Sequence, residues 1–292
     1  MCSNKKFISG LVLMIAFISI SVVGYATTPY NFAQQISGKE NFSPSSSHPM
    51  GTDALGRDMS ARIFVGVGIS ICIAISAVLI NFIIGVFFGS LAGYIGGLAD
   101  TFIMRSADIV ASIPEILYLI VIMVFLKDVA DSKNIFISVI NQSHGLIGII
   151  ITLCIAFWIP LARILRNQIL SLKESEFIMA ARIYGASDFR IIVKYIFPNC
   201  LPLILVTTIS RIPTAIFFEA FLSFIGLGME SPFPSLGVLM SDGLSSMRSA
   251  PYLLFFPSVS IILIIYAFNL LGDGLRDILD DKIITQKINY NI

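Results

Sequence analysis

The sequence is poor in charged residues for its length. Only 13% of its 292 residues are charged, about half of the share that soluble domains carry. With 56% hydrophobic residues and a mean hydropathy of +0.89, a soluble fold would lack the polar surface that keeps it in solution. Intrinsic disorder is excluded for the same reason, because disordered chains are rich in charge and poor in apolar residues.

Histidine, cysteine and basic runs are scarce too. His48 and His144 both lie in predicted loops, and the four cysteines form no C-x-x-C pair, so neither a zinc site nor a redox motif is indicated. The net charge is +1 and no basic run exceeds two residues, which argues against nucleic acid as a partner. We expect no metal or cofactor in this chain.

Long apolar runs are what the sequence has instead. A helix needs about 20 apolar residues to cross about 30 Å of hydrocarbon. Six runs meet this need, at residues 7–25, 63–94, 102–126, 145–165, 198–222 and 252–271. The expected fold class is an all-α integral membrane protein with about six transmembrane helices. The first run follows Lys5 and Lys6, so a cleaved signal peptide is the alternative to a retained first helix.

The distribution of Lys and Arg predicts the orientation. These residues are about twice as frequent on the side that holds both termini and the segment 166–197, which places that side in the cytoplasm. The predicted division is residues 1–61, a first transmembrane helix and extracytoplasmic loop; residues 62–282, a five-helix core with a cytoplasmic loop at about 172–198; and residues 283–292, a cytoplasmic tail.

A glycine pair on the outer side has the spacing of a phosphate-binding loop but not its chemistry. Gly51 and Gly56 are followed by Arg57 and Asp58, where a phosphate-binding loop needs Lys and Ser or Thr. A carboxylate at that position would repel phosphate. We therefore interpret the segment as a turn that anchors the second span, with a cation site at Asp53 and Asp58 as the weaker alternative.

A second set of glycines lies within the second span. Gly85, Gly89 and Gly93 repeat every four residues and therefore share one helix face, which lets another helix approach closely. Ordinary helix packing and a tight crossing in a moving core both account for the pattern.

Four charged residues fall within predicted spans, where charges are costly. They are Asp108, Glu115, Arg211 and Glu219. Asp108 and Glu115 are seven residues apart, which predicts one shared helix face, although Pro114 permits a bend between them. Either these groups line or stabilise a substrate path, with Asp108, Arg211 and Glu219 as candidates, or they form internal ion pairs that fix helix register.

The predicted cytoplasmic loop is the most informative segment. Residues 177–199 predict a short helix through Ala180 and Ala181, a break at Gly185 and a second helix that ends near Pro198. Small residues let a partner protein close over the first helix, and glycine adopts conformations that side chains forbid. This is the shape of a docking element; the alternative is an amphipathic helix on the membrane surface.

The loop resembles the EAA loop of ABC-importer permeases, which reads Glu-Ala-Ala, three residues, Gly, nine residues, Ile-x-Leu-Pro. Ala180, Ala181, Gly185 and Pro198 match at that spacing. Departures from the motif are Met179 for Glu, Tyr195 for Ile and Phe197 for Leu. The resemblance assigns coupling to a partner ATPase to Met179, Ala180, Ala181, Gly185, Ala186, Asp188 and Pro198.

Three further segments narrow the resemblance. Residues 48–62 with Gly-Thr-Asp-x-x-Gly-Arg-Asp, residues 219–237 and residues 267–277 look like the dipeptide/oligopeptide/nickel permease family. The start of the N-terminal loop, with its Gly-Thr-Asp segment and one short outer loop, looks like the C-type subunit of that family. The similarity covers roughly residues 48–282. Ordered motifs over that length are more specific than the EAA match alone.

The resemblance implies a function and a set of partners. It implies a type I ABC-importer permease of a bacterial inner membrane that moves peptides inward by alternating access. The implied partners are a homologous permease, two ATPase subunits that bind ATP and Mg, an extracytoplasmic binding protein, a peptide substrate and membrane lipid. The chain itself would be no enzyme. Alternatives are import of nickel or another small solute, an ion-coupled carrier, and a membrane anchor or sensor.

Overall fold

The computed structural model describes residues 2–130, 143 and 145–290. Across these residues the protein is helical, and the β structure they contain is one isolated bridge between Thr52 and Asp58. His144 lies outside the described residues.

Most of the chain is in long helices joined by short segments, and the two long connections lie before α2 and around α11. The helices are α1 (Cys2–Thr27), α2 (Met59–Ile95), α3 (Gly97–Ala111), α4 (Glu115–Ala130), α6 (Leu146–Lys173), α7 (Glu176–Ile183), α8 (Asp188–Ile191), the π-helical turn η1 (Ile192–Ile196), α9 (Phe197–Ile209), α10 (Ile212–Phe224), α11 (Leu236–Ser245) and α12 (Tyr252–Tyr290).

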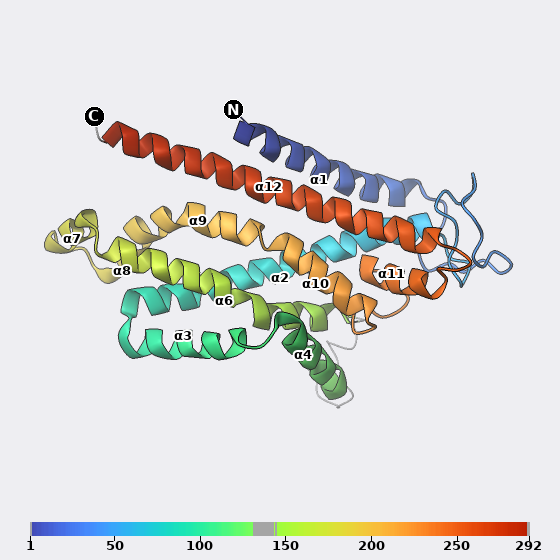
Figure 1. The fold of residues 1–292 in the computed structure, drawn as a ribbon, viewed down its shortest axis with the longest axis horizontal. Helices are drawn as coiled ribbons and strands as arrows, with labels where there is room; N and C mark the ends of the chain where they lie inside the picture. Colours follow the sequence, from blue (N-terminus) through green and yellow to red (C-terminus); the bar gives the residue numbers. More distant parts are fainter. Residues whose placement is uncertain (1, 131–142, 144, 291–292) are drawn as a thin grey trace.

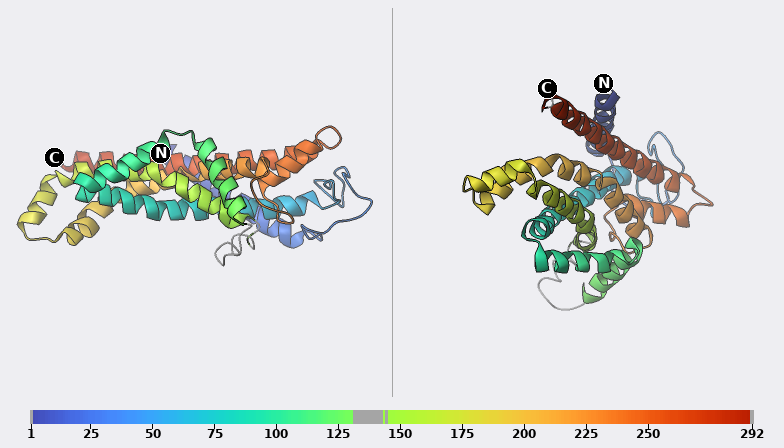
Figure 2. Two further views of the ribbon diagram at one scale, coloured as in Figure 1. Left: turned by 90° about the horizontal axis from the view of Figure 1, so that it is seen from below. Right: turned by 60° about the vertical axis from the view of Figure 1, so that its left-hand side comes forward.

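The bundle is elongated and its two ends differ (Figure 1). One end, here the hairpin end, carries α7 and α8; the other, the loop end, carries residues 28–58 and α11. The α1–α12 pair and the α3–α4 pair lie on opposite sides of the bundle (Figures 1 and 2). α1 runs beside α12 in the opposite direction, so both chain ends point toward the hairpin end (Figure 1).

α1 packs closely against α12. A Cβ on Gly10 would meet the Leu271 backbone nitrogen at 2.6 Å, and one on Gly274 would meet the Phe7 nitrogen at 2.3 Å. Lys6 Nζ also pairs with Asp277 Oδ2 at 2.9 Å. Backbones approach this closely only where small residues remove the intervening side chains.

The spans agree with the sequence, and the third one is bent. Five described helices are long and apolar enough to cross a membrane, or up to six if each bent pair is one span. The apolar segment predicted at residues 102–126 is a bent pair, α3 and α4, which meet at an angle of 93° and form either one broken span or a re-entrant loop. Pro114 disfavours helical geometry at Ile113, and α3 ends just before, at Ala111. Asp108 and Glu115 therefore lie on different helices, not on one face as predicted.

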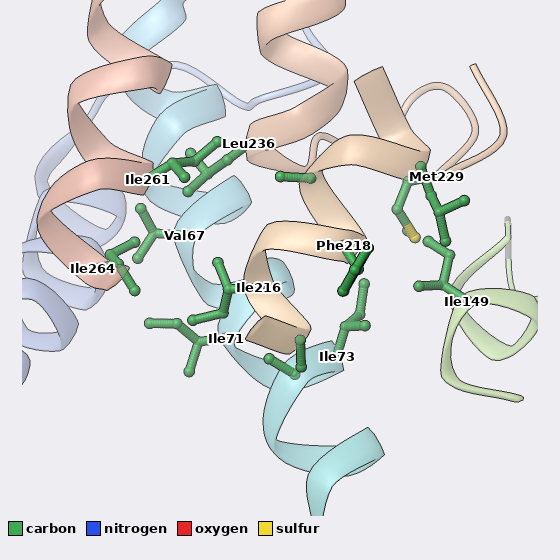
Figure 3. Close-up of a cluster of buried hydrophobic side chains, with 14 of the residues drawn as sticks. Val67, Ile71, Ile73, Ile149, Ile216, Phe218, Met229, Leu236, Ile261 and Ile264 are labelled. Carbon is green, nitrogen blue, oxygen red and sulfur yellow. The ribbon is translucent and has the colours of Figure 1, made fainter. Parts of the chain in front are cut away.

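The main core lies where α2, α10, α11 and α12 meet (Figure 3). Ile73, Ile216 and Leu236 are fully buried there. The glycine stripe lies toward the hairpin end: a Cβ on Gly89 would meet the Ala162 carbonyl oxygen at 2.8 Å. The predicted close crossing of the second span is thus confirmed, and its partner is α6.

Candidate functional site

The predicted docking element is a helical hairpin, formed by α7, a turn and α8. Two hydrogen bonds close α7: Ala186 N donates to Ala181 O at 3.0 Å and Gly185 N donates to Arg182 O at 2.9 Å. This pair of bonds is a Schellman motif, which needs a left-handed residue after the helix. Gly185 supplies it with φ +76°. The predicted break at Gly185 is confirmed, and its cause is backbone conformation.

The second half of the hairpin is longer than the sequence indicated. Ser187 caps α8 by accepting a hydrogen bond from Arg190 N at 3.4 Å, and the chain then stays helical through η1 and α9 as far as Ile209. The predicted end near Pro198 is wrong. Pro198 lies in the first turn of α9, and the π-helical turn before it absorbs the backbone hydrogen bond that proline cannot make. The hairpin therefore continues directly into a membrane span.

A separate apolar cluster holds the hairpin to the bundle. Ile178 of α7 and Ile191 of α8 are both 0% exposed, and they pack with Leu165 and Ile169 of α6 and with Cys200 of α9. An eight-residue helix such as α7 is marginal by itself in water. Its position is therefore set by this cluster, which is distinct from the main core.

Tyr94, near the end of α2, is a polar tie that sequence reasoning missed. Its hydroxyl donates a hydrogen bond to Asp188 Oδ1. Its carbonyl oxygen accepts from Lys173 Nζ at 2.7 Å, and the same ammonium group lies 5.4 Å from the centre of the Tyr94 ring. Nothing in the sequence around Tyr94 signals this, because its partners lie 79 and 94 residues further along the chain.

The outer surface of the hairpin is apolar. Ile183 is 84% exposed, Tyr184 91% and Phe189 75%. Phe177 and Met179 are about half exposed beside them. A group of large apolar side chains at the tip of a membrane protein, beyond its apolar spans, is typical of a protein–protein interface.

The residues assigned to coupling fall into two groups. Ala181 is buried against the bundle and Ala186 is half-buried. The exposed members are Met179, Ala180, Gly185, Asp188 and Pro198. All but Pro198 lie within the hairpin, and their role in coupling stays a prediction.

The three candidates for a substrate path lie apart from one another. Asp108 Oδ1 pairs with Arg163 Nη2 of α6 at 2.7 Å, and Arg211 is half-buried beside a cavity at the junction of α9 and α10. Glu219 is 0% exposed. The internal ion pair that the sequence left open is thus present for Asp108, and the path roles stay predictions.

Glu219 lies in a pocket of hydroxyl groups where α2, α10 and α11 meet. Ser223 Oγ donates a hydrogen bond to its Oε1 at 2.9 Å, and the hydroxyls of Ser70 and Ser235 face the same carboxyl group. Because Ser235 is the N-cap of α11, the carboxyl group lies at the positive end of that helix. The arrangement fixes three elements to one another.

At the loop end, the motif around Gly51 and Gly56 is an anchor, as predicted. The Asp53 carboxylate pairs with Arg57 Nε at 2.7 Å and with Arg62 Nη1. Arg62 is 2% exposed and also reaches Asp242 of α11, at 3.1 Å.

Asp58 caps α2 by accepting from Ala61 N at 2.8 Å, and it pairs with His48 Nδ1 at the same distance. The weaker cation hypothesis is not supported, because protein donors occupy the oxygens of both Asp53 and Asp58.

The comparisons with known proteins agree with this geometry. Residues 85–285 match the family "Binding-protein-dependent transport system inner membrane component". The chain is 39% identical over 281 residues to the dipeptide transport system permease protein DppC of Bacillus subtilis (strain 168), covering 96% of this chain and 83% of that protein. It is 40% identical over 281 residues to the oligopeptide transport system permease protein OppC of the same strain, covering 96% and 87%.

A solved structure shares the fold. It is one of the inward-facing conformations of the MetNI methionine ABC transporter, with a TM-score of 0.57 and 19% identity, covering 75% of this chain and 96% of the matched chain. At that identity the likeness concerns the fold alone. The chain belongs to the family of inner membrane components of binding-protein-dependent transport systems, and it is a multi-pass permease of the ABC-importer type.

Proposed function

We propose that this chain is one permease subunit of an ATP-driven importer that moves dipeptides or oligopeptides into the cytoplasm. The proposal joins the relatives' named substrates with one observation, the exposed apolar tip of the α7–α8 hairpin. A partner ATPase covers this tip, and ATP and Mg bind in that partner. Peptide reaches the permease from an extracytoplasmic binding protein.

The hairpin transmits movement because it is continuous with a span. From Asp188 to Ile209 the chain has no break in helical structure, so a displacement of α8 moves α9 along its axis. Tyr94 connects the same hairpin to α2, and Lys173 of α6 in turn binds the carbonyl oxygen of Tyr94. ATPase closure would therefore reach three spans and rock the permease between inward-open and outward-open states.

The proposed orientation puts the hairpin end and both termini in the cytoplasm. A second, homologous permease completes the path, and two ATPase subunits dock on the two hairpins. The excess of Lys and Arg at the hairpin side supports this orientation.

Site-specific cross-linking tests the docking. A photoreactive amino acid at Tyr184, in the assembled complex in membranes, is expected to capture an ATPase subunit, and the same probe at Phe42 of the loop end is not. Capture at Phe42 but not Tyr184, or capture of no ATPase at either position, would overturn the proposed docking.

Uptake in a strain that lacks the gene tests the substrate. Restoring the chain is expected to restore uptake of labelled dipeptides and oligopeptides, with no effect on nickel accumulation. Restored nickel uptake without peptide uptake would replace peptides by nickel as substrate. Uptake by the purified chain alone in liposomes, driven by a proton or sodium gradient, would instead indicate an ion-coupled carrier.

A further inference from the structure

A basic cavity of about 360 Å³ opens where α6, α9 and α12 meet. It lies beside the break between α9 and α10, at Ser210 and Arg211. Its lining residues are Ile164, Pro202, Leu203, Val206, Thr207, Ser210, Arg211, Arg276 and Leu279. Two arginines thus line one mostly apolar space, and none of these described lining residues is acidic.

Arg211 differs from the other arginines at the spans. Arg62, Arg163 and Arg166 each pair with an aspartate. For Arg211, by contrast, the charge interacts with Tyr118 of α4, and within the described residues its side chain makes no hydrogen bond or ion pair. A half-buried charge inside a span needs a partner or water. The three other arginines have an aspartate as partner, and Arg211 still needs one. Arg276 makes a further interaction of its own.

The cavity lies on the hairpin side of the membrane. Asp277, next to Arg276, pairs with Lys6 at the start of α1, which places Arg276 at the edge of the apolar region. Gly272 faces Ser210, since a Cβ added to Gly272 would lie 3.1 Å from Ser210 Oγ, and it lies one turn of α12, about 6 Å, further into the bundle than Arg276. The cavity therefore runs from the membrane edge inward to Arg211.

This combination of charge, depth and apolar walls fits one class of ligand. Guanidinium groups bind phosphate oxygens through charge-assisted hydrogen bonds, and the Ser210 hydroxyl adds a polar group beside them. Leu203, Val206 and Leu279 supply an apolar wall for the glycerol and upper acyl region of a lipid. Basic pockets between transmembrane helices on the cytoplasmic side are typical sites for anionic lipid headgroups.

We propose that this cavity binds the phosphate of an anionic phospholipid from the leaflet at the hairpin end. In the orientation of the proposed function, on which this detail rests, that leaflet is the cytoplasmic one. A peptide substrate would bring an amino group as well as a carboxylate, and the lining offers no acidic partner for the amino group. The bound lipid lies at the junction between α9 and α10.

Lipid binding to the purified importer complex tests the proposal without transport. Native mass spectrometry would compare retention of phosphatidylglycerol and phosphatidylcholine. Arg211→Gln is expected to weaken phosphatidylglycerol retention about fivefold, and Arg211→Lys, which keeps the charge, to weaken it less. The matched control is Arg105→Gln, an exposed arginine of α3 outside the cavity, which should change nothing.

Competition distinguishes the possible sources of the anion. Retained phosphatidylglycerol should not be displaced by millimolar inorganic phosphate or by a dipeptide. Displacement by inorganic phosphate would make the cavity a free-phosphate site. Displacement by a dipeptide but not by its C-terminal amide would make it a substrate site. Equal retention in Arg211→Gln and the unchanged complex would also overturn the proposal.

The two proposals fail separately. If the complex takes up peptides but shows no preference for phosphatidylglycerol at this cavity, only the lipid site is wrong. If phosphatidylglycerol binds as expected but no peptide is taken up, the lipid site stands and the proposed substrate is wrong.

Discussion

The two ends of this permease are held by opposite means. At the loop end, Asp53 bridges two arginines that are almost fully buried, and Arg62 extends the network to Asp242 of α11. At the hairpin end, a few aliphatic side chains around Ile178 and Ile191 anchor two short helices whose outer surface is exposed. Buried ion pairs have strict geometry, because removing one partner strands a charge. Aliphatic contacts are non-directional and tolerate small shifts.

This difference separates a fixed end from an adjustable one. The loop end positions α2, α11 and the residue 28–58 loop relative to one another, so mutations there should act through folding. The hairpin end presents its surface outward, so mutations there should act on coupling and leave the fold intact.

Replacing Arg62 should be the most damaging change. Arg62→Met leaves Arg57 to pair with both Asp53 and Asp242, so the cluster keeps one uncompensated negative charge, and we expect the free energy of unfolding to fall by about 3–5 kcal/mol. Thermal unfolding in detergent would measure this. Arg248→Met, an exposed arginine of the same end, is the control. Equal unfolding temperatures for the two variants would show that the buried ion pairs of Arg62 do not stabilise the loop end.

Gly185 should separate coupling from folding. No heavy atom lies within 4 Å of a Cβ added there, so only the positive φ opposes a side chain. Gly185→Val is expected to abolish uptake with the unfolding temperature unchanged, because a β-branched residue resists this conformation. Gly185→Asn, which tolerates it, should keep most of the uptake. Gly185→Arg should behave as the valine variant, with normal membrane insertion; normal uptake by either would contradict the proposed role.

Two glycines of α2 should respond differently to alanine. Gly89 abuts α6, so Gly89→Ala forces the helices apart and should cost about 1–3 kcal/mol of stability. Gly68 has no atom within 4 Å of the added Cβ, so Gly68→Ala should be neutral or stabilise by up to about 1 kcal/mol. Unfolding measurements on both variants decide this. Equal losses of stability in the two variants would show that Gly89 is not needed for the close approach of α2 and α6.

Tyr94 should give the smallest effect. Tyr94→Phe keeps the ring beside Lys173 and removes only the hydrogen bond to Asp188, so we expect a loss of about 1 kcal/mol confined to the hairpin. Hydrogen exchange should report faster exchange in α8 and no change in α11. Tyr25→Phe, on the exposed side of α1, is the control, and faster exchange throughout the protein would show that Tyr94 supports the whole fold.

Much of the fold could be predicted from the sequence, because local signals were sufficient. Apolar length predicted the spans, the glycine spacing predicted a close helix crossing, and the motif at Gly185 predicted a break that the Schellman bonds explain. Pro114 signalled a bend but not its size. The 93° angle between α3 and α4 depends on what each helix packs against, which a local pattern does not encode.

The site residues that sequence reasoning missed have distant partners. Arg62 and Asp242 meet across 180 positions of the chain, and Tyr94 and Asp188 across 94. The sequence around one residue does not show which distant residue it contacts. The error at Pro198 has a different cause: proline usually ends a helix, and here a π-helical turn accommodates it.

The break at Ser210 divides the 37-residue segment from Asp188 to Phe224 into a long arm and a short one. The hairpin sits at the tip of the long arm, and the short arm ends among the hydroxyl groups around Glu219. A ligand bound at this break would determine how far α10 moves for a given displacement of the hairpin. The coupling of ATP hydrolysis to transport would then depend on the lipid composition of the bilayer as well.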